Sequence, residues 1–210
     1  MIKGTRTLLG PEARKMNWFT QRFRNTVNAA GYQEFIPSVM ADPQIFVDKA
    51  GPEILGQMYV FKDKGERDVC LIPEVTAIAQ KLYKEDWSKA MPKPVKIWYL
   101  TRCYRYERPQ LGRYREFWQF GVENMGGNTS KEEMIDLLRK CLDECKLEYI
   151  INDSVKRGLS YYIEEGFEAE IANLGAQKQV AGGGRYDCGI GWAIGVDRVV
   201  LSKESWKPEM

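Results

Sequence analysis

Three arginines in a short loop are the residues of this sequence whose type and spacing most directly suggest chemistry. The loop, residues 108–115, carries Arg108, Arg113 and Arg115, and it also contains Gly112, which gives the backbone freedom to bend. The planar, forked guanidinium group of arginine matches the geometry of phosphate oxygens. The loop therefore indicates phosphate binding, with a mobile basic surface loop as the alternative.

The strand expected after this loop places useful side chains on one face. Side chains alternate between the two faces of a strand, so a period of two defines each face. One face carries Phe117, Gln119, Gly121 and Glu123. The opposite face carries the apolar residues Trp118, Phe120 and Val122, and on the preceding strand Cys103, Arg105 and Glu107 share a face. An aromatic ring, an amide and charged groups behind a packed apolar face favour a binding surface over a merely solvated one.

The chain contains no histidine. It therefore lacks the side chain that most often serves as general base and as metal ligand. The common phosphate-binding loop, G-x-x-x-x-G-K-[ST], is absent as well, and the glycine run 182–184 by itself indicates a turn. Any chemistry is therefore expected to depend on arginine, carboxylate, tyrosine and glutamine side chains and on a bound ion.

Length and composition indicate one globular domain over residues 1–210, because 44% of the residues are hydrophobic and 29% are charged. A net charge of +2 makes no case for nucleic-acid binding. The sequence shows neither a membrane-spanning apolar run nor the apolar core of a signal peptide, so a cytoplasmic location is expected. Five cysteines with irregular spacing suit reduced thiols. Cys141 and Cys145 are interpreted as buried core residues rather than half of a metal site.

Hydrophobic spacing and turn residues predict the elements that position these side chains. Helices are expected from Pro11 to Gly31, over residues 42–50 and 73–84, and after Ser130, while residues 191–198 run from strand into helix. Strands are expected over residues 32–37, 58–65, 68–72, 95–107, 116–123, 147–151, 167–171 and 179–181, with a turn at Gly175. This order favours an α+β fold, with a mostly antiparallel sheet of six to seven strands flanked by helices.

Six blocks of the sequence carry a family resemblance. Residues 105–124 and 191–198 look like motifs 2 and 3 of the class II aminoacyl-tRNA synthetases. Residues 31–37, with the preceding helix, look like motif 1, the dimer element. Residues 73–76 resemble the loop that holds the substrate amino group, and residues 157–162 and 181–187 resemble two histidine-specific motifs. Taken together, and in their order along the chain, the six blocks resemble the histidyl-tRNA synthetase family and imply the class II catalytic fold.

The resemblance implies roles at the nucleotide end of a site. Arg105 would contact the α-phosphate of ATP, with Arg157 as the catalytic cation beside it. Glu107 would meet the adenine, and Phe117 would stack on the ring. Arg113 and Arg198 would hold the γ-phosphate of a bent ATP molecule, and Mg²⁺ would accompany the nucleotide. No side chain is assigned as a metal ligand.

The resemblance also implies roles at the amino-acid end. Three residues would fix the amino and carboxylate groups of histidine: Glu74, Thr76 and Gln119. Three others would line the imidazole pocket: Glu123, Tyr162 and Tyr186. Arg157 would contact the amino acid as well as the α-phosphate, and Gln110 lies where the family reads the acceptor end of tRNA(His). A homodimer is the expected assembly.

The sequence departs from the family pattern at several points. Residues 125–156 hold only one expected helix and one strand in place of an insertion domain, and the few residues after Arg198 leave no room for an anticodon-binding domain. The segment 188–190 is short. Three single positions also differ from the usual residue type: Ile72 replaces an arginine, Trp118 a histidine and Ser160 an acid.

These departures leave three functions open. The first is a minimal catalytic core that makes histidyl-adenylate and transfers histidine weakly to tRNA(His). The second is a histidine-sensing regulator similar to the regulatory subunit of ATP phosphoribosyltransferase. The third is an adenylating enzyme that acylates an acceptor other than tRNA. Retention of all four phosphate-directed arginines favours the first: Arg105, Arg113, Arg157 and Arg198.

Overall fold

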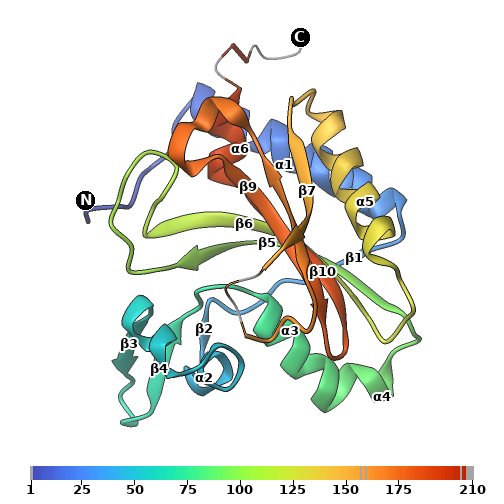
Figure 1. Ribbon diagram of the computed structural model, residues 1–210. Helices are drawn as coiled ribbons and strands as arrows, with labels where there is room; N and C mark the ends of the chain where they lie inside the picture. Colours follow the sequence, from blue (N-terminus) through green and yellow to red (C-terminus); the bar gives the residue numbers. More distant parts are fainter. Residues whose placement is uncertain (1, 157, 159, 204, 207–210) are drawn as a thin grey trace.

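The protein is built around a seven-stranded sheet with the strand order β1-β5-β6-β10-β9-β8-β7 (Figure 1). The computed structural model describes residues 2–156, 158, 160–203 and 205–206. The strands are β1 (Gln33–Glu34), β5 (Val95–Tyr104), β6 (Glu116–Met125), β7 (Ile150–Val155), β8 (Gly166–Glu170), β9 (Gln179–Tyr186) and β10 (Gly189–Gly195). Every pairing is antiparallel except β1 with β5. The prediction of an α+β fold with a mostly antiparallel sheet is confirmed.

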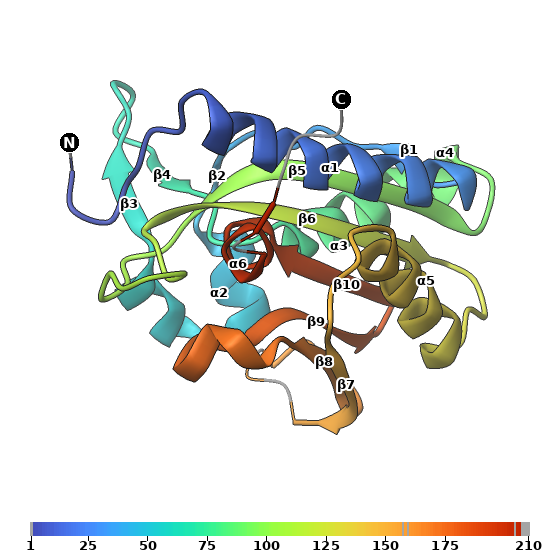
Figure 2. The same ribbon diagram turned by 90° about the horizontal axis from the view of Figure 1, so that it is seen from above.

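Three helices cover one face of this sheet: α1 (Pro11–Ala29), α5 (Lys131–Glu144) and α6 (Val196–Ser202), as Figure 2 shows from above. The buried side of α1 carries Phe19, Phe23 and Val27 at four-residue spacing. α5 begins with a capping box, in which Ser130 Oγ accepts the Glu133 N–H at 3.1 Å and Glu133 Oε2 accepts the Ser130 N–H at 2.7 Å. The apolar stripes of these helices pack on the sheet and form the main core.

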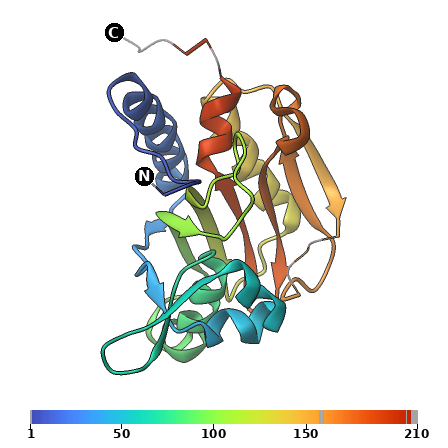
Figure 3. The same cartoon turned by 90° about the vertical axis from the view of Figure 1, so that its left-hand side faces the viewer.

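A smaller layer packs against the other face of β5. It contains a second sheet in the order β2-β4-β3, made of β2 (Met40–Ala41), β4 (Asp68–Leu71) and β3 (Tyr59–Lys62). Around it lie α2 (Gln44–Ala50), η1 (Pro52–Gln57) and α3 (Thr76–Leu82), which continues through the π-helical η2 (Tyr83–Trp87) into α4 (Ser88–Ala90). Figure 3 shows the small sheet and α2, in cyan and teal, away from α1 and α5. Because this layer packs on β5, the neighbouring strands keep an open face.

The register of the central strands puts small residues beside the functional ones. On β10, Gly191 is opposite Glu123 of β6, and Gly195 is opposite Gln119. A β-carbon added at Gly191 would lie 1.8 Å from Glu123 Oε2. Gly191 and Gly195 therefore lie at the base of the open face, where their lack of a side chain leaves room for the side chains of β6.

Several predicted boundaries are wrong. The strand expected over residues 147–151 begins only at Ile150, because Lys146 has φ 52° and the Leu147 N–H bonds back to the carbonyl of Leu142 at 3.3 Å, which closes α5. The strand expected to reach residue 107 ends at Tyr104. The helix expected to begin at residue 73 begins at Thr76. The glycine run 182–184 lies inside β9 rather than in a turn.

The turn expected at Gly175 lies within a short helical segment, η3 (Ala172–Gln177), in which Gly175 has φ 59°. Within the described ranges, no helix is long and apolar enough to cross a membrane.

Candidate functional site

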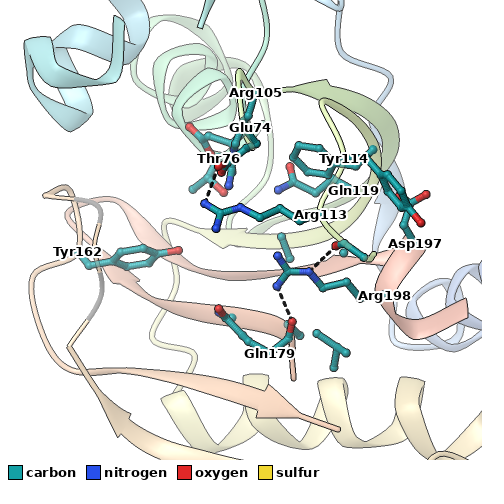
Figure 4. A pocket seen from close by; sticks show the side chains of 18 of the residues that line it. Glu74, Thr76, Arg105, Arg113, Tyr114, Gln119, Tyr162, Gln179, Asp197 and Arg198 are labelled. Atoms are coloured by element: carbon teal, nitrogen blue, oxygen red, sulfur yellow. Dashed lines mark hydrogen bonds and ion pairs between the residues drawn. The ribbon is translucent and has the colours of Figure 1, made fainter. Parts of the chain in front are cut away.

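A cavity opens on the face of the large sheet that the three helices leave free (Figure 4). Its walls come from β6, β9 and β10, from the loop that precedes α3, from the loop between β5 and β6, and from the start of α6. Nine residues predicted from the sequence line it: Glu74, Thr76, Arg105, Glu107, Arg113, Phe117, Gln119, Tyr162 and Arg198. Segments far apart in the sequence thus meet at one place.

One end of the cavity is positively charged. Arg113 and Arg198 point into it (Figure 4). Arg113 Nη2 lies 2.5 Å from Glu107 Oε2, and Arg198 donates to the carbonyls of Gly112 at 2.9 Å and Gln179 at 2.7 Å. Burial lowers the pKa of Arg198, and the like charges of Arg113 and Arg105 lower it further. A cluster of mutually repelling guanidinium groups suits a polyanion such as a nucleotide.

Arg105 joins this charged end to the rest of the cavity. Its Nε donates to the carbonyl of Pro73 at 2.9 Å, and its guanidinium carbon lies 5.2 Å from the centre of the Phe117 ring. The backbone N–H of Arg105 also donates to the carbonyl of Arg115 at 3.0 Å. Arg105 therefore fixes the loop before α3 relative to the strand face and ties two walls of the cavity together.

The base of the loop between β5 and β6 is tied to α6 and to the N-terminal segment. Asp197 is only 3% exposed, and its Oδ2 accepts the backbone N–H of Trp118 at 2.6 Å. Its other oxygen pairs with Arg6, whose guanidinium carbon lies 4.5 Å from the centre of the Tyr114 ring. The N–H of Arg115 donates to the carbonyl of Gly4 at 2.8 Å. Asp197 thus connects the start of α6 to the N-terminal segment and to β6.

Replacing Asp197 is expected to cost more stability than replacing Arg6. Asp197→Ala should lower the free energy of unfolding by about 1–3 kcal/mol, because the half-buried Trp118 N–H loses its acceptor and the charge of Arg6 loses its partner. Arg6→Ala should cost less, since its side chain is 25% exposed and Asp197 keeps the Trp118 bond. Denaturant unfolding of both variants measures the difference. An equal or larger loss in Arg6→Ala would contradict this role for Asp197.

The inner end of the site is built around a buried carboxyl group. Glu123 is 0% exposed, and its oxygens accept hydrogen bonds from the hydroxyls of Thr76 and Tyr186, each at 2.7 Å, and of Tyr99 at 3.4 Å. Burial raises the pKa of Glu123 to about 8, although these hydroxyl donors act in the opposite direction. Burial also raises the pKa of Tyr186 well above its usual value. Thr76 both lines the cavity and touches Glu123, so it connects the two ends.

A second carboxyl group lies at the junction of the two ends. Glu74 is 5% exposed, and its oxygens accept the N–H of Ala77 at 2.9 Å and the hydroxyl of Tyr161 at 3.4 Å. Burial raises the pKa of Glu74, and the positive charge of Arg105 partly opposes that effect. This arrangement suits an ammonium group, which would supply both the charge and the donors that a buried carboxylate needs.

The remaining predicted residues have different outcomes. Tyr186 and Glu123 lie beneath the cavity lining rather than on it. Gln110 is exposed on the loop, paired through its backbone with Arg113, and does not line the cavity. Arg157, assigned as the catalytic cation, lies outside the described residues. Ile72 is fully buried in the core of the small layer, and Ser160 Oγ donates to the carbonyl of Lys49 at 2.7 Å.

Sequence reasoning missed four site residues: Tyr99, Tyr114, Tyr161 and Gln179. Tyr99 could have been found, because a period of two puts it on the face of Cys103, and it pairs with Gly121, where a β-carbon would lie 2.1 Å from the tyrosine ring. Tyr161 adjoins Tyr162 within residues 157–162, which resemble a histidine-specific motif. For Gln179, whose carbonyl accepts from Arg198, no local pattern gives a signal.

The acidic residues of the cavity do not form a metal cage. Among the described residues, no group of three or more histidine, cysteine, aspartate or glutamate side chains could hold a metal ion. Mg²⁺ commonly binds through substrate phosphates with one or two carboxylates. Glu107, beside Arg113 at the charged end, is a carboxylate that fits this limited role.

The matching family model and the relatives with similar sequences point to one family. Residues 4–153 match the family model described as histidyl-tRNA synthetase. A histidine–tRNA ligase of Pyrococcus horikoshii is 42% identical over 127 residues, which cover 60% of this chain and 29% of that protein. A histidine–tRNA ligase of Methanospirillum hungatei is 28% identical over 312 aligned residues, which cover 98% of this chain and 76% of the relative.

The fold also matches a solved structure. The ATP phosphoribosyltransferase regulatory subunit/histidyl-tRNA synthetase from Bacillus halodurans superposes with a TM-score of 0.81 at 16% identity, covering 96% of this chain and 82% of that one. This likeness supports the assignment of the fold.

Proposed function

Because the chain belongs to the histidyl-tRNA synthetase family, we propose that it activates histidine with ATP, forming histidyl-adenylate and pyrophosphate. One observation carries the proposal. A buried carboxyl group surrounded by hydroxyls, Glu123, lies beneath the same cavity whose other end holds Arg105, Arg113 and Arg198. An imidazole ring offers both a donor and an acceptor to such a pocket, and a triphosphate fits the arginines.

The reaction needs positioned charge and no nucleophile from the protein. A carboxylate oxygen of histidine attacks the α-phosphorus of ATP, the bond from that phosphorus to the bridging oxygen of the β-phosphate breaks, and pyrophosphate leaves with the electron pair. Arg105, Arg113 and Arg198 line the cavity; in this proposal Arg105 would stabilise charge on the α-phosphate, and Arg113 and Arg198 would hold the leaving phosphates. Mg²⁺ supplies further neutralisation of the phosphates when it is bound. The absence of histidine from the chain therefore removes nothing that this reaction requires.

The other residues of the cavity would fix the two substrates. Phe117 would stack on the adenine, with Glu107 beside it. Glu74, Thr76 and Gln119 would hold the amino and carboxylate groups of histidine, and Tyr162 and Tyr186 would meet its ring with Glu123. Gln110, exposed on its loop, would contact the acceptor end of tRNA(His), and residues 31–37 would contribute to a homodimer. Transfer to tRNA follows activation in this scheme.

Histidine-dependent exchange of labelled pyrophosphate into ATP tests activation directly. We expect exchange with histidine and none without an amino acid. Exchange that depends on a different amino acid would favour an enzyme acylating another acceptor. Histidine binding without exchange would replace the proposal with a regulatory function.

The regulatory alternative has one specific observation in its favour. The phosphate-directed arginines already have protein partners, because Arg113 pairs with Glu107 and Arg198 donates to the carbonyls of Gly112 and Gln179. A chain that senses histidine could use these arginines as structural ties. ATP binding, measured by calorimetry in the presence of histidine, separates the two functions, since activation requires that triphosphate oxygens compete for the same groups.

Arg157→Ala is expected to abolish histidine-dependent exchange while leaving the fold and histidine binding largely intact. The role comes from the family resemblance, which puts this cation beside the α-phosphate, where charge develops during the reaction. Lys156→Ala is the matched control, because it removes the adjacent and exposed cation. Exchange that survives in Arg157→Ala at the level of Lys156→Ala would refute the assignment.

A further inference from the structure

We propose that the inner pocket binds histidine as an imidazolium ion, and that Glu123 supplies the ring proton when the amino acid enters. The proposal, which rests on histidine being the substrate, assigns the proton to a particular atom in each state. Glu123 carries it in the empty pocket, on the carboxyl group. The ring carries it in the filled pocket, and Glu123 is then a carboxylate. The pocket would thus recognise the basicity of the ring as well as its shape.

Among the described residues, the groups that contact Glu123 include no cation. α3 presents the hydroxyl of Thr76, β5 that of Tyr99 and β9 that of Tyr186. β10 presents Gly191, which has no side chain, and the loop before α3 presents Glu74, whose charge raises the pKa of Glu123. These neighbours can hydrogen-bond a carboxylate, but none of them can neutralise it.

The empty pocket therefore favours the neutral carboxyl group. A fully buried carboxylate is costly without a positive partner. The pKa of Glu123, raised by burial to about 8, agrees with a neutral group at pH 7. The three hydroxyls each contain a rotatable proton, so one of them can turn to accept from the carboxyl group while the others donate.

A bound imidazole ring reverses this preference. An opposite charge within about 4–6 Å lowers the pKa of a carboxyl group by about 1–3 pH units, and the carboxylate raises the pKa of the ring by the same coupling. A pKa shift of this size is as large as the difference between the pKa of Glu123, near 8, and the usual ring pKa of about 6.5. After transfer, all three hydroxyls can donate to the carboxylate. The ion pair thus has both the charge and the hydrogen bonds that a buried pair requires.

Discrimination against non-basic rings follows from proton transfer. The analogue 1,2,4-triazolyl-3-alanine has nearly the shape of histidine, but its ring is far less basic. It would leave Glu123 protonated and would form no ion pair. We expect the ratio of kcat/KM for exchange to favour histidine by at least about tenfold over this analogue.

The absence of histidine from the chain makes the proton directly observable. Nitrogen NMR of ring-¹⁵N-labelled histidine, bound to the full chain at pH 7, reports on the ligand ring without any background from protein histidines. Two ring nitrogens with similar shifts, both coupled to protons, would establish the imidazolium. Two widely separated shifts, with one nitrogen unprotonated, would overturn proton transfer while leaving histidine as the substrate. Absence of any bound signal at saturating histidine would refute the substrate assignment and this inference together.

Glu123→Gln supplies the matched variant, because the amide keeps the size of the side chain but cannot give up a proton. Its fold can be checked by tryptophan fluorescence. The ring bound to this variant should be neutral, and the preference for histidine over the triazole should fall to about twofold or less. An imidazolium signal in the variant would show that the proton comes from elsewhere and would overturn the role of Glu123.

The pH dependence of histidine binding reports how many protons are taken up or released when histidine binds. Between about pH 6.5 and pH 8, the ring and Glu123 together hold one proton both before and after binding, so the affinity should not change with pH. Below this range binding must release a proton, and above it binding must take one up, so affinity should fall on both sides. Affinity that rises between about pH 6.5 and pH 8 and is level above that range would show a neutral ring bound to charged Glu123, which contradicts the proposal.

Discussion

Gly191→Ala is expected to lose at least about 100-fold in histidine affinity, because the new methyl group has no space beside the buried carboxyl group. The added β-carbon would lie 1.8 Å from Glu123 Oε2 and 2.6 Å from the carbonyl oxygen of Val122. Rotation of Glu123 alone cannot relieve the contact, since the second atom belongs to the backbone of β6. We also expect the free energy of unfolding to fall by about 1–3 kcal/mol, as overpacked cores typically show.

Gly195→Ala is the matched control for this substitution. Gly195 lies on the same strand and the same face, opposite Gln119, but the nearest heavy atom to its added β-carbon is 3.8 Å away. Its φ of −77° suits alanine, so no backbone strain is added. Calorimetric titration with histidine in the absence of ATP compares the two variants. Histidine affinity within threefold of the parent in Gly191→Ala would mean that the ring does not bind beside Glu123.

The strand face that carries the site could be predicted because its pattern is local. β5 and β6 pair without a break from Val95–Met125 to Tyr104–Glu116, so the period of two holds along the whole hairpin. Gln119 therefore lies at the cavity, Glu123 lies beneath it, and Phe120 is buried on the opposite side, as the alternation predicts. A local period is enough to assign faces once a hairpin keeps its register.

The glycine run of β9 could not be placed from the sequence, because its structure depends on distant contacts. Glycine alone favours turns, which is the basis of the wrong prediction. In the fold, a β-carbon at Gly183 would lie 2.3 Å from the carbonyl oxygen of Gly191, and one at Gly184 would lie 2.8 Å from the Tyr162 ring. Close approach of neighbouring strands and rings therefore selects glycine here, and no short-range pattern reports that approach.

Asp197 illustrates the same limit for a charged residue. Its partners are Arg6, 191 positions away in the sequence, and the backbone of Trp118. Burial in the fold makes Asp197 a connector between three segments, and nothing in the local sequence indicates those partners. Residue type and spacing can identify a group that needs a partner, but the identity of that partner depends on the tertiary fold.

Arg105→Ala is expected to reduce the rate of histidine-dependent exchange by about 10²–10³, the usual effect of removing one donor that stabilises charge in a transition state. The loss should divide between kcat and the KM for histidine. The fall in kcat reflects the missing charge at the α-phosphate. The rise in KM reflects loss of the 2.9 Å bond from Arg105 Nε to the carbonyl of Pro73, which holds Glu74 in place.

Two companion variants separate these effects. Arg102→Ala removes an arginine of β5 that does not line the cavity and lies 49% exposed beside Glu116, so exchange should stay within about twofold of the parent. Arg105→Lys keeps a positive charge but loses the guanidinium fork. It should recover part of kcat while the KM for histidine remains raised. If Arg105→Ala and Arg102→Ala have equal rates, the charge at Arg105 does not act on the reacting phosphate. The arginines of the cavity would then be structural ties, and the regulatory function would become the better reading of the fold.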